Sequence, residues 1–265
     1  MKGLERKMGR MNRFMRNGHS LILAYDQGLE HGPTDFNEKN VDPAYVIDIA
    51  NRGGFDAFVC QKGIAEKYHE LIDVPILMKV NGKTAIYGRD PVARQNCSVS
   101  YAEKLGASAI GYTIYIGSQF EGEMMAEFGR IQEEAHDLGL AVVLWIYPRG
   151  EYVKNDTAPE MIAYAARSAL ELGADAAKIK YTGDRKSFSW AVRAAGSIPV
   201  YMAGGKKTKD ETDFLRQAHD CISAGATGLA VGRNVWQSED PLEFSKRLNS
   251  VVIEGREPET VLKTA

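Results

Sequence analysis

The sequence predicts a single α/β domain, a (β/α)₈ barrel of the TIM-barrel class. Eight short apolar segments alternate with amphipathic segments over about 240 residues. Most of the amphipathic segments have a Gly or Pro near one end, as helices commonly do. Strand and helix alternating eight times is the pattern of this barrel. A doubly wound open sheet is the structural alternative.

The expected strands are the eight apolar runs Ser20–Tyr25, Ala57–Cys60, Pro75–Val80, Ser108–Tyr112, Ala141–Ile146, Ala176–Tyr181, Pro199–Met202 and Gly228–Val231. The clearest helices are expected at Gly122–Leu138, Pro159–Leu172, Lys209–Ala224 and Pro241–Val252. No linker, low-complexity tract or further repeat interrupts the alternation. We therefore expect one domain over residues 1–265, with the barrel at about 18–255 and a loose tail from about residue 257.

The first 16 residues are basic, with six Lys or Arg against one Glu. Leu4, Met8, Met11 and Met15 recur at helical spacing, a pattern shared with targeting presequences and membrane-surface helices. The apolar stripe is narrow, however, and the first strand follows almost at once. We therefore expect a structural helix that closes the bottom of the barrel.

Composition narrows the class of protein. The chain has 265 residues, 44% hydrophobic and 26% charged, and can bury a large core. A net charge of −2 gives no basic field for nucleic acid, and no apolar run approaches the roughly 20 residues that cross a bilayer. Cys60, Cys97 and Cys221 are too few and too scattered for a disulfide framework, which suggests a cytoplasmic protein. The five histidines lack metal-ligand spacing, so we expect no metal.

The strand expected at Ala176–Tyr181 carries Lys178 and Lys180, which alternation places on one face. On an exposed edge, or paired with carboxylates, they would be ordinary solvated lysines, which is the commoner case. Inside a barrel, at about 7 Å and an effective dielectric of about 20, their repulsion is roughly 2.4 kcal/mol, or about 1.7 pKa units. Repulsion and burial both favour the neutral amine that Schiff-base chemistry requires.

Other strand ends carry groups that suit chemistry, because active sites of such barrels lie at the carboxyl ends of the strands. After the first strand, Asp26 shares the inward face with Ile22 and Ala24 and could act as a general base or bind a substrate hydroxyl. An N-cap or turn role is the commoner fate of such an Asp and remains open.

The fifth strand ends in Trp145-Ile146-Tyr147-Pro148-Arg149-Gly150. Trp145 and Tyr147 share a face, and this strand neighbours the lysine strand in an ordinary barrel. A phenol close to an ammonium can donate a proton, and an Arg can bind a phosphate. An aromatic plug with a surface Arg is an equally good interpretation of these residues.

Glycines follow the last two expected strands, at Ala203-Gly204-Gly205 and at Gly232 before Arg233. A barrel phosphate site needs such glycines, because bare backbone N–H groups must approach the phosphate oxygens. Glycines used only for tight turns are the alternative. Agreement between two loops favours the phosphate site.

Taken together, four motifs make the chain similar to a known family. They are Leu23-Ala24-Tyr25-Asp26-Gln27-Gly28-Leu29-Glu30-His31-Gly32-Pro33, Trp145–Gly150, Lys178-Ile179-Lys180-Tyr181-Thr182-Gly183-Asp184 and Val231-Gly232-Arg233-Asn234-Val235-Trp236. With these motifs in order from about Ser20 to Gln237, the sequence resembles the archaeal-type class I fructose-1,6-bisphosphate aldolases, in the DeoC/FbaB-like group of Schiff-base aldolases. The resemblance implies a cofactor-free lyase of glycolysis or gluconeogenesis that acts on a sugar phosphate.

The resemblance also assigns roles to residues. It makes Lys178 the Schiff-base residue, Tyr147 the proton donor and Asp26 the group that binds substrate hydroxyls and assists proton transfer. It is the resemblance that selects Lys178 over Lys180. The positions that it assigns to contact with the substrate or its phosphates are Gln27, Trp145, Arg149, Lys180, Ala203, Gly204, Gly205, Gly232 and Arg233.

Two departures from the family pattern bear on substrate preference. Many relatives have His where this chain has Gln27, and some have Ser where it has Ala203. Gln27 can still hydrogen-bond a sugar oxygen but cannot shuttle a proton. A sister Schiff-base enzyme, such as 2-amino-3,7-dideoxy-heptulosonate synthase, and a non-catalytic sugar-phosphate-binding barrel are the alternative functions. Relatives form large homo-oligomers, so we also expect a homo-oligomer, with a decamer as one candidate state.

Overall fold

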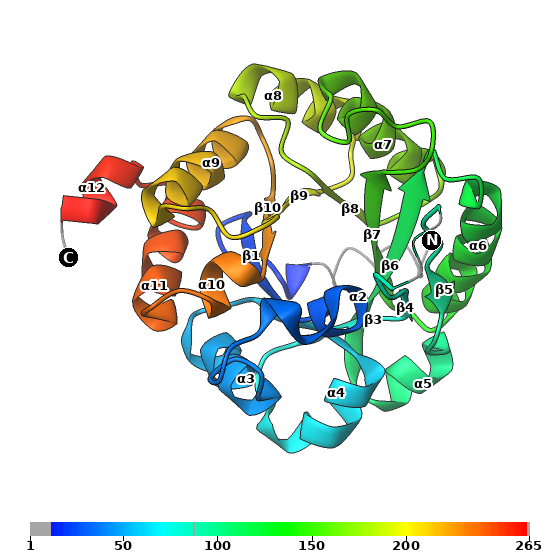
Figure 1. Cartoon of the computed structure of the whole chain (residues 1–265), viewed down its shortest axis with the longest axis horizontal. Coiled ribbons are helices and arrows are strands. Elements are labelled where there is room, and N and C mark those ends of the chain that lie inside the picture. Colours follow the sequence, from blue (N-terminus) through cyan, green and yellow to red (C-terminus); the bar gives the residue numbers. More distant parts are fainter. Residues whose placement is uncertain (1–11, 87, 89, 264–265) are drawn as a thin grey trace.

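The computed structural model describes residues 12–86, 88 and 90–263. Eight parallel strands form a closed barrel in the order β1-β10-β9-β8-β7-β6-β3-β2, with helices around the outside (Figure 1). The strands are β1 (Ser20–Ala24), β2 (Ala57–Gln61), β3 (Ile76–Lys79), β6 (Ala107–Ile116), β7 (Ala141–Pro148), β8 (Ala176–Ile179), β9 (Val200–Ala203) and β10 (Gly228–Val231). Because β1 pairs with both β2 and β10, the ring is complete. The predicted barrel is confirmed, and the open-sheet alternative is wrong.

Helices and short segments connect the strands. The helices are α2 (Gln27–His31), α3 (Pro43–Arg52), α4 (Lys62–Tyr68), α5 (Val99–Lys104), α6 (Glu121–Asp137), α7 (Pro159–Glu171), α8 (Arg185–Ala194), α9 (Glu211–Ser223), α10 (Arg233–Trp236), α11 (Pro241–Val252) and α12 (Pro258–Lys263). Two 3₁₀ turns, η1 (Gly32–Asp35) and η2 (His69–Leu71), and a small hairpin of β4 (Asn81–Gly82) and β5 (Arg94–Gln95) complete the described elements. The short helices α2 and α10 lie inside the outer ring of helices, beside β1 (Figure 1).

Local sequence explains where several of the outer helices begin. At five of them, a side chain just before the first turn accepts a hydrogen bond from a backbone N–H inside it, which stabilises a helix by about 1 kcal/mol. These capping residues are Asp42, Ser98, Asp184, Asp210 and Asp240.

The hydrophobic core has two parts, separated by the strands. Outward-facing strand residues such as Leu23, Phe58 and Ile179 pack against the helices. Inward-facing residues such as Ile22, Val143 and Tyr201 fill the barrel itself, where alternation along each strand points them. The interior is therefore packed, and a cavity can form only at one of its ends.

At the amino end of the barrel, Phe14 is 1% exposed and belongs to the interior cluster with Ile22 and Ala57. Arg16 forms an ion pair with Asp56, which fixes the segment before β1. The helix predicted for the first 16 residues falls mostly outside the described residues. The helix was expected to close the amino end of the barrel, and the structure shows the side chain of Phe14 at that end.

Two elements differ most from expectation, while β7 ends two residues later and β8 two residues earlier than predicted. Strand β6 continues to Ile116, beyond the predicted Tyr112, and pairs with β7 up to Ile116 opposite Pro148. Its last residues alternate in polarity, so they do not form the continuous apolar run by which the other strands were recognised. The tail expected to be loose from about residue 257 instead forms α12, where Val261 is buried and Glu259 pairs with Arg216.

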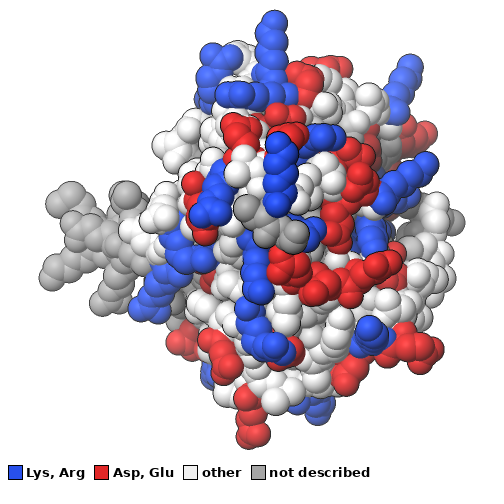
Figure 2. Space-filling view, turned by 90° about the vertical axis from the view of Figure 1, so that its left-hand side faces the viewer, with Lys and Arg blue, Asp and Glu red and all other residues white. Residues whose placement is uncertain are grey.

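Figure 2 shows the surface that lies on the left-hand side of Figure 1. Lys and Arg side chains are interspersed there with Asp and Glu side chains. No broad field of one sign appears on that face, in keeping with the net charge of −2. No helix within the described part of the chain is both long and apolar enough to span a membrane.

Candidate active site

A cavity of about 1140 Å³ opens at the carboxyl ends of the strands. Its wall brings together every residue that the sequence singled out, from the first strand to the last. They are Asp26, Gln27, Trp145, Tyr147, Arg149, Lys178, Lys180, Ala203, Gly204, Gly205, Gly232 and Arg233. Their positions are observed, whereas their roles in binding and catalysis remain predictions.

Lys178 lies on β8 and points into the barrel, where it is 6% exposed. It makes no hydrogen bond or ion pair with any residue that the structure describes. Its Nζ atom lies 4.8 Å from the centre of the Trp145 ring, on the neighbouring strand β7. Burial lowers the pKa of Lys178 from 10.5 to about 8, with Asp26 raising it and Lys79 lowering it further. About a tenth of the amine is therefore neutral at pH 7, far more than for an ordinary lysine.

The lysine that lowers the pKa of Lys178 is not the one expected. Lys180 follows the end of β8 and forms an ion pair with Asp156, so its charge is compensated. Lys79, on β3, is 1% exposed, and its Nζ donates to the backbone and side-chain oxygens of Asn81 at 2.8 and 2.7 Å. The expectation that Lys180 repels Lys178 is therefore wrong. The inward position of Lys79 on an otherwise apolar strand was the signal that could have identified it.

Asp26 and Tyr147 lie on the same cavity as Lys178. Asp26 is 8% exposed and occupies the N-cap position of α2 without making a capping hydrogen bond. Its carboxylate is the main charge that keeps the pKa of Lys178 from falling further. Burial raises the pKa of Tyr147 well above 10, and the negative charges of Asp26 and Glu30 raise it more. The phenol therefore stays protonated and can serve as a proton donor.

Glu30 and Tyr115 also line the cavity, and sequence reasoning missed both. The Tyr115 hydroxyl donates to Glu30 Oε1 at 3.1 Å, which connects β6 to α2 across the mouth. The guanidinium carbon of Arg149 lies 5.7 Å from the centre of the Tyr115 ring. Tyr115 and its neighbours thus hold the positively charged side chain of Arg149 at the cavity wall opposite the loops after β9 and β10. Tyr115 was missed because β6 was expected to end at Tyr112.

The loops after β9 and β10 require glycine for close packing. A Cβ atom on Gly204 would lie 3.0 Å from Val231 Cα, and one on Gly232 would lie 2.4 Å from Gln27 Nε2 and 2.7 Å from Ala24 O. Gly232 thus lets the Gln27 amide lie directly against the backbone that follows β10. Close approach of backbone is also what a phosphate needs, so the packing and binding explanations for these glycines are compatible.

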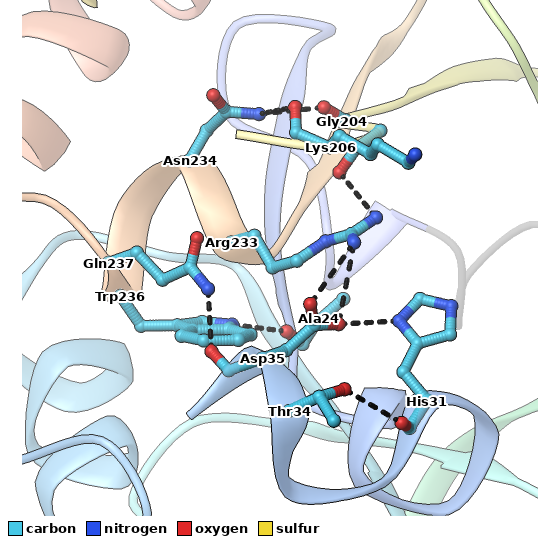
Figure 3. A network of polar contacts seen from close by, with 11 residues as sticks. Ala24, His31, Thr34, Asp35, Gly204, Lys206, Arg233, Asn234, Trp236 and Gln237 are labelled. Atoms are coloured by element: carbon cyan, nitrogen blue, oxygen red, sulfur yellow. Dashed lines mark hydrogen bonds and ion pairs between the residues drawn. The ribbon is translucent and has the colours of Figure 1, made fainter. Parts of the chain in front are cut away.

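Arg233 is held between two loops at this side of the cavity (Figure 3). Its Nη1 atom donates to Asp35 Oδ2 at 3.4 Å, and its Nη2 atom donates to the carbonyl oxygen of Gly205 at 3.0 Å. Asp35 is itself fixed by His31 Nδ1 at 2.6 Å and, through its backbone oxygen, by Gln237 Nε2 at 2.6 Å. The guanidinium is therefore preorganised beside the glycines. Among the described residues, no group of three or more His, Cys, Asp and Glu side chains is arranged to hold a metal ion.

A barrel with a desolvated lysine, a protonated tyrosine and a carboxylate on one cavity has the arrangement of a lyase that works through a lysine Schiff base. The chain belongs to the DeoC/LacD family of aldolases, whose family model matches residues 20–238. It is thus an aldolase.

Individual relatives agree with this assignment. Fructose-bisphosphate aldolase class 1 of Thermoproteus tenax is 56% identical over 245 residues, covering 92% of this chain and 93% of the relative. A crystal structure of an archaeal fructose 1,6-bisphosphate aldolase superposes with a TM-score of 0.91 at 55% identity, covering 94% of this chain and 100% of the other. A 2-amino-3,7-dideoxy-D-threo-hept-6-ulosonate synthase of Archaeoglobus fulgidus is 34% identical over 97% of this chain and 95% of the relative.

One further solved structure bears on the chemistry. It is an archaeal fructose-1,6-bisphosphate aldolase whose catalytic lysine is covalently bound to the carbinolamine intermediate of the substrate. It superposes with a TM-score of 0.90 at 54% identity, covering 93% of this chain and 99% of the other. A lysine-bound intermediate is therefore found on the same fold in a close relative.

Proposed function

We propose that the protein is a class I fructose-bisphosphate aldolase, which reversibly cleaves fructose 1,6-bisphosphate to dihydroxyacetone phosphate and glyceraldehyde 3-phosphate. The observation that carries the proposal is the environment of Lys178. Its amine is buried, has no hydrogen-bond or ion-pair partner among the described residues and has a pKa of about 8. Relatives at 51% to 56% identity carry this activity in their names.

In the proposed mechanism, neutral Lys178 attacks the C2 carbonyl of the open-chain sugar and forms a carbinolamine. Tyr147 donates a proton to the leaving hydroxyl, and loss of water gives the iminium ion. Asp26 accepts the proton of the C4 hydroxyl, and the C3–C4 bond breaks with its electrons flowing into the iminium. Glyceraldehyde 3-phosphate leaves, the enamine is protonated at C3, and water releases dihydroxyacetone phosphate from Lys178.

The two phosphates would hold the sugar at both ends of the cavity. The backbone after β9 and β10, with Arg233 beside it, suits one phosphate, and Arg149 on the opposite wall suits the other. Binding at both ends aligns the scissile bond with the lysine, which converts binding energy into rate. Trp145 and Gln27 would contact the sugar between these ends, and Lys180 would meet a phosphate once Asp156 releases it.

We further propose that the enzyme needs no metal, works in the cytoplasm and assembles as a homo-oligomer. The Schiff base itself withdraws the electrons that a metal ion would withdraw in other aldolases, which supports the first point. Size-exclusion chromatography with light scattering measures the assembly. A single subunit of 29.2 kDa in solution would contradict the last point.

A coupled assay for cleavage of fructose 1,6-bisphosphate tests the proposal. Turnover that persists in a chelator supports a class I aldolase. Absence of cleavage, with transfer of a sugar-phosphate fragment instead, would favour the heptulosonate synthase, which shares the lysine strand and the glycine loops. Binding of the sugar phosphate without any turnover would favour the non-catalytic barrel.

A further inference from the structure

The loop after β9 is held by side chains of α10 at three successive carbonyl groups. Asn234 Nδ2 donates to Gly204 O at 2.7 Å and to Lys206 O at 3.1 Å. Arg233 Nη2 donates to the intervening Gly205 O at 3.0 Å. Figure 3 shows Asn234 and Arg233 reaching this loop from one short helix. Every carbonyl of the segment 204–206 is therefore drawn toward α10.

This arrangement sets the direction of the amide groups. In a planar trans peptide the N–H points opposite to the C=O of the preceding residue. The N–H groups of Gly205, Lys206 and Lys207 are therefore turned away from α10, and none of them donates to a described residue. Gly205 has a φ of +64°, a backbone conformation that helps successive N–H groups converge. Unpaired N–H groups on such a turn can together bind an anion, and Gly205 and Lys206 both line the cavity.

The hydrogen bonds of Asn234 specify a carboxamide. Its Nδ2 donates to two carbonyls, while its Oδ1 accepts from the N–H of Thr208 at 2.8 Å and from the Thr208 hydroxyl at 3.1 Å. A carboxylate would set an acceptor against two carbonyl oxygens, and a leucine of similar shape would make none of these bonds. Asn234 is 3% exposed and is not among the residues that line the cavity.

From these contacts we propose that Asn234 is the positioning residue of the phosphate subsite. It acts without touching substrate, by holding the loop so that the N–H groups of Gly205, Lys206 and Lys207 face a phosphate. Arg233, which Asp35 holds in turn, supports the middle carbonyl. This inference rests on the proposed aldolase function and adds to it the residue that makes the enzyme select phosphorylated ketones.

The test compares dihydroxyacetone phosphate with dihydroxyacetone, which differs only in lacking the phosphate. Borohydride trapping rates and kcat/KM in condensation with glyceraldehyde 3-phosphate are measured for both ketones in wild type and Asn234→Leu. The preference for the phosphorylated ketone should fall by about tenfold to a hundredfold, through KM rather than kcat, with dihydroxyacetone unaffected. An unchanged preference, or an equal loss for both ketones, would overturn the proposal.

Asn51→Leu is the matched control. Asn51 makes a similar pair of bonds outside the cavity, from its Nδ2 to Leu71 O at 2.7 Å and from the N–H of Asp73 to its Oδ1 at 3.0 Å. The Asn51→Leu variant should show the same preference between the two ketones as the wild type. A reduced preference in this control would show that loss of any such asparagine has the same effect, which contradicts a specific role.

A second measurement does not depend on a variant folding or on catalysis. Hydrogen exchange of the wild-type protein is followed by mass spectrometry with and without inorganic phosphate. The segment 203–208 should gain protection with phosphate, and an unprotected segment would overturn the inference. Wild type that forms no adduct with dihydroxyacetone phosphate would instead defeat the proposed function, so the two failures are distinguishable.

Discussion

The amine of Lys178 lies 4.8 Å from the centre of the Trp145 ring, and the two residues are paired in register on β8 and β7. The Nζ of Lys79 lies 5.9 Å from the same ring. A cation near an indole is stabilised by about 0.5 to 2 kcal/mol. Burial acts in the opposite direction, and the pKa of about 8 for Lys178 shows that burial prevails. Trp145 thus limits the cost of two ammonium groups in one barrel without keeping Lys178 fully charged.

The pH dependence of Schiff-base formation should follow this pKa. Because only the neutral amine attacks a carbonyl, the trapping rate should rise as pH increases through about 8. Lys79→Met should move the midpoint upward by about one pH unit, because it removes a neighbouring positive charge. Lys180→Met should leave the midpoint in place, because Asp156 already compensates the charge of Lys180. Trapping rates between pH 6 and pH 10 test this, and a shift in Lys180→Met alone would contradict it.

Lys178 should also reduce the stability of the fold. Its pKa is about 8 in the folded protein and about 10.4 in an unfolded chain, so between these values the unfolded chain binds more protons. Stability therefore increases with pH across this window, and below pH 8 the full cost of about 3 kcal/mol applies. Lys178→Met should raise the free energy of unfolding by up to that amount at pH 7, and by less at pH 10.

Urea denaturation at the two pH values measures this effect. Lys246→Met is the control, because that side chain is 76% exposed and pairs with Glu243, which is exposed as well. It should change the free energy of unfolding little at either pH. Equal stability of wild type and Lys178→Met at pH 7 would show that the buried amine has no cost.

Tyr147→Phe should lower kcat by about 10² to 10⁴ while the protein stays folded, because it removes only the proposed proton donor. Tyr112→Phe is a matched control from the neighbouring strand. Its hydroxyl donates to Glu127 at 2.6 Å on the outer side of the barrel, so kcat should be retained. Steady-state cleavage rates of both variants decide the matter. Near-normal turnover in Tyr147→Phe would remove Tyr147 from its proposed role.

Asp35→Asn should weaken binding of phosphorylated substrates. Asp35 accepts from Arg233 and from His31, and a neutral amide would hold the guanidinium less firmly. We expect KM for fructose 1,6-bisphosphate to rise about threefold to thirtyfold with kcat changed less than threefold. Arg52→Gln is the control, because its pair with Asp48 lies on the exposed face of α3. A fall in kcat at constant KM would contradict a role in phosphate binding.

The fold was predictable from the sequence because buried parallel strands leave continuous apolar runs, and each run was visible without knowledge of its partners. The same logic found Tyr147 and Asp26, which stand just beyond the end of such a run, and Lys178, a charged residue inside one. In the extension of β6, Thr113 interrupts the apolar run, and this hid Tyr115. The short helix α12 was missed because its stability comes from contact with α9 rather than from its own six residues.

Other features depend on long-range geometry. That Lys79 rather than Lys180 faces Lys178 depends on which strands close the barrel and where Asp156 lies. The part that Asn234 plays depends on two carbonyls of a loop, those of Gly204 and Lys206, which lie 30 and 28 residues away in the chain. No local pattern encodes such contacts, so spacing alone could identify the glycines of the loop but not the side chain that shapes it.

The most direct test of the account is to add borohydride together with dihydroxyacetone phosphate, measure the intact mass and locate the modified peptide. The account predicts one adduct per chain in wild type, on Lys178, and none in Lys178→Met. An adduct on Lys79 or Lys180, or an unmodified protein that still cleaves fructose 1,6-bisphosphate, would contradict the claim that Lys178 forms the Schiff base.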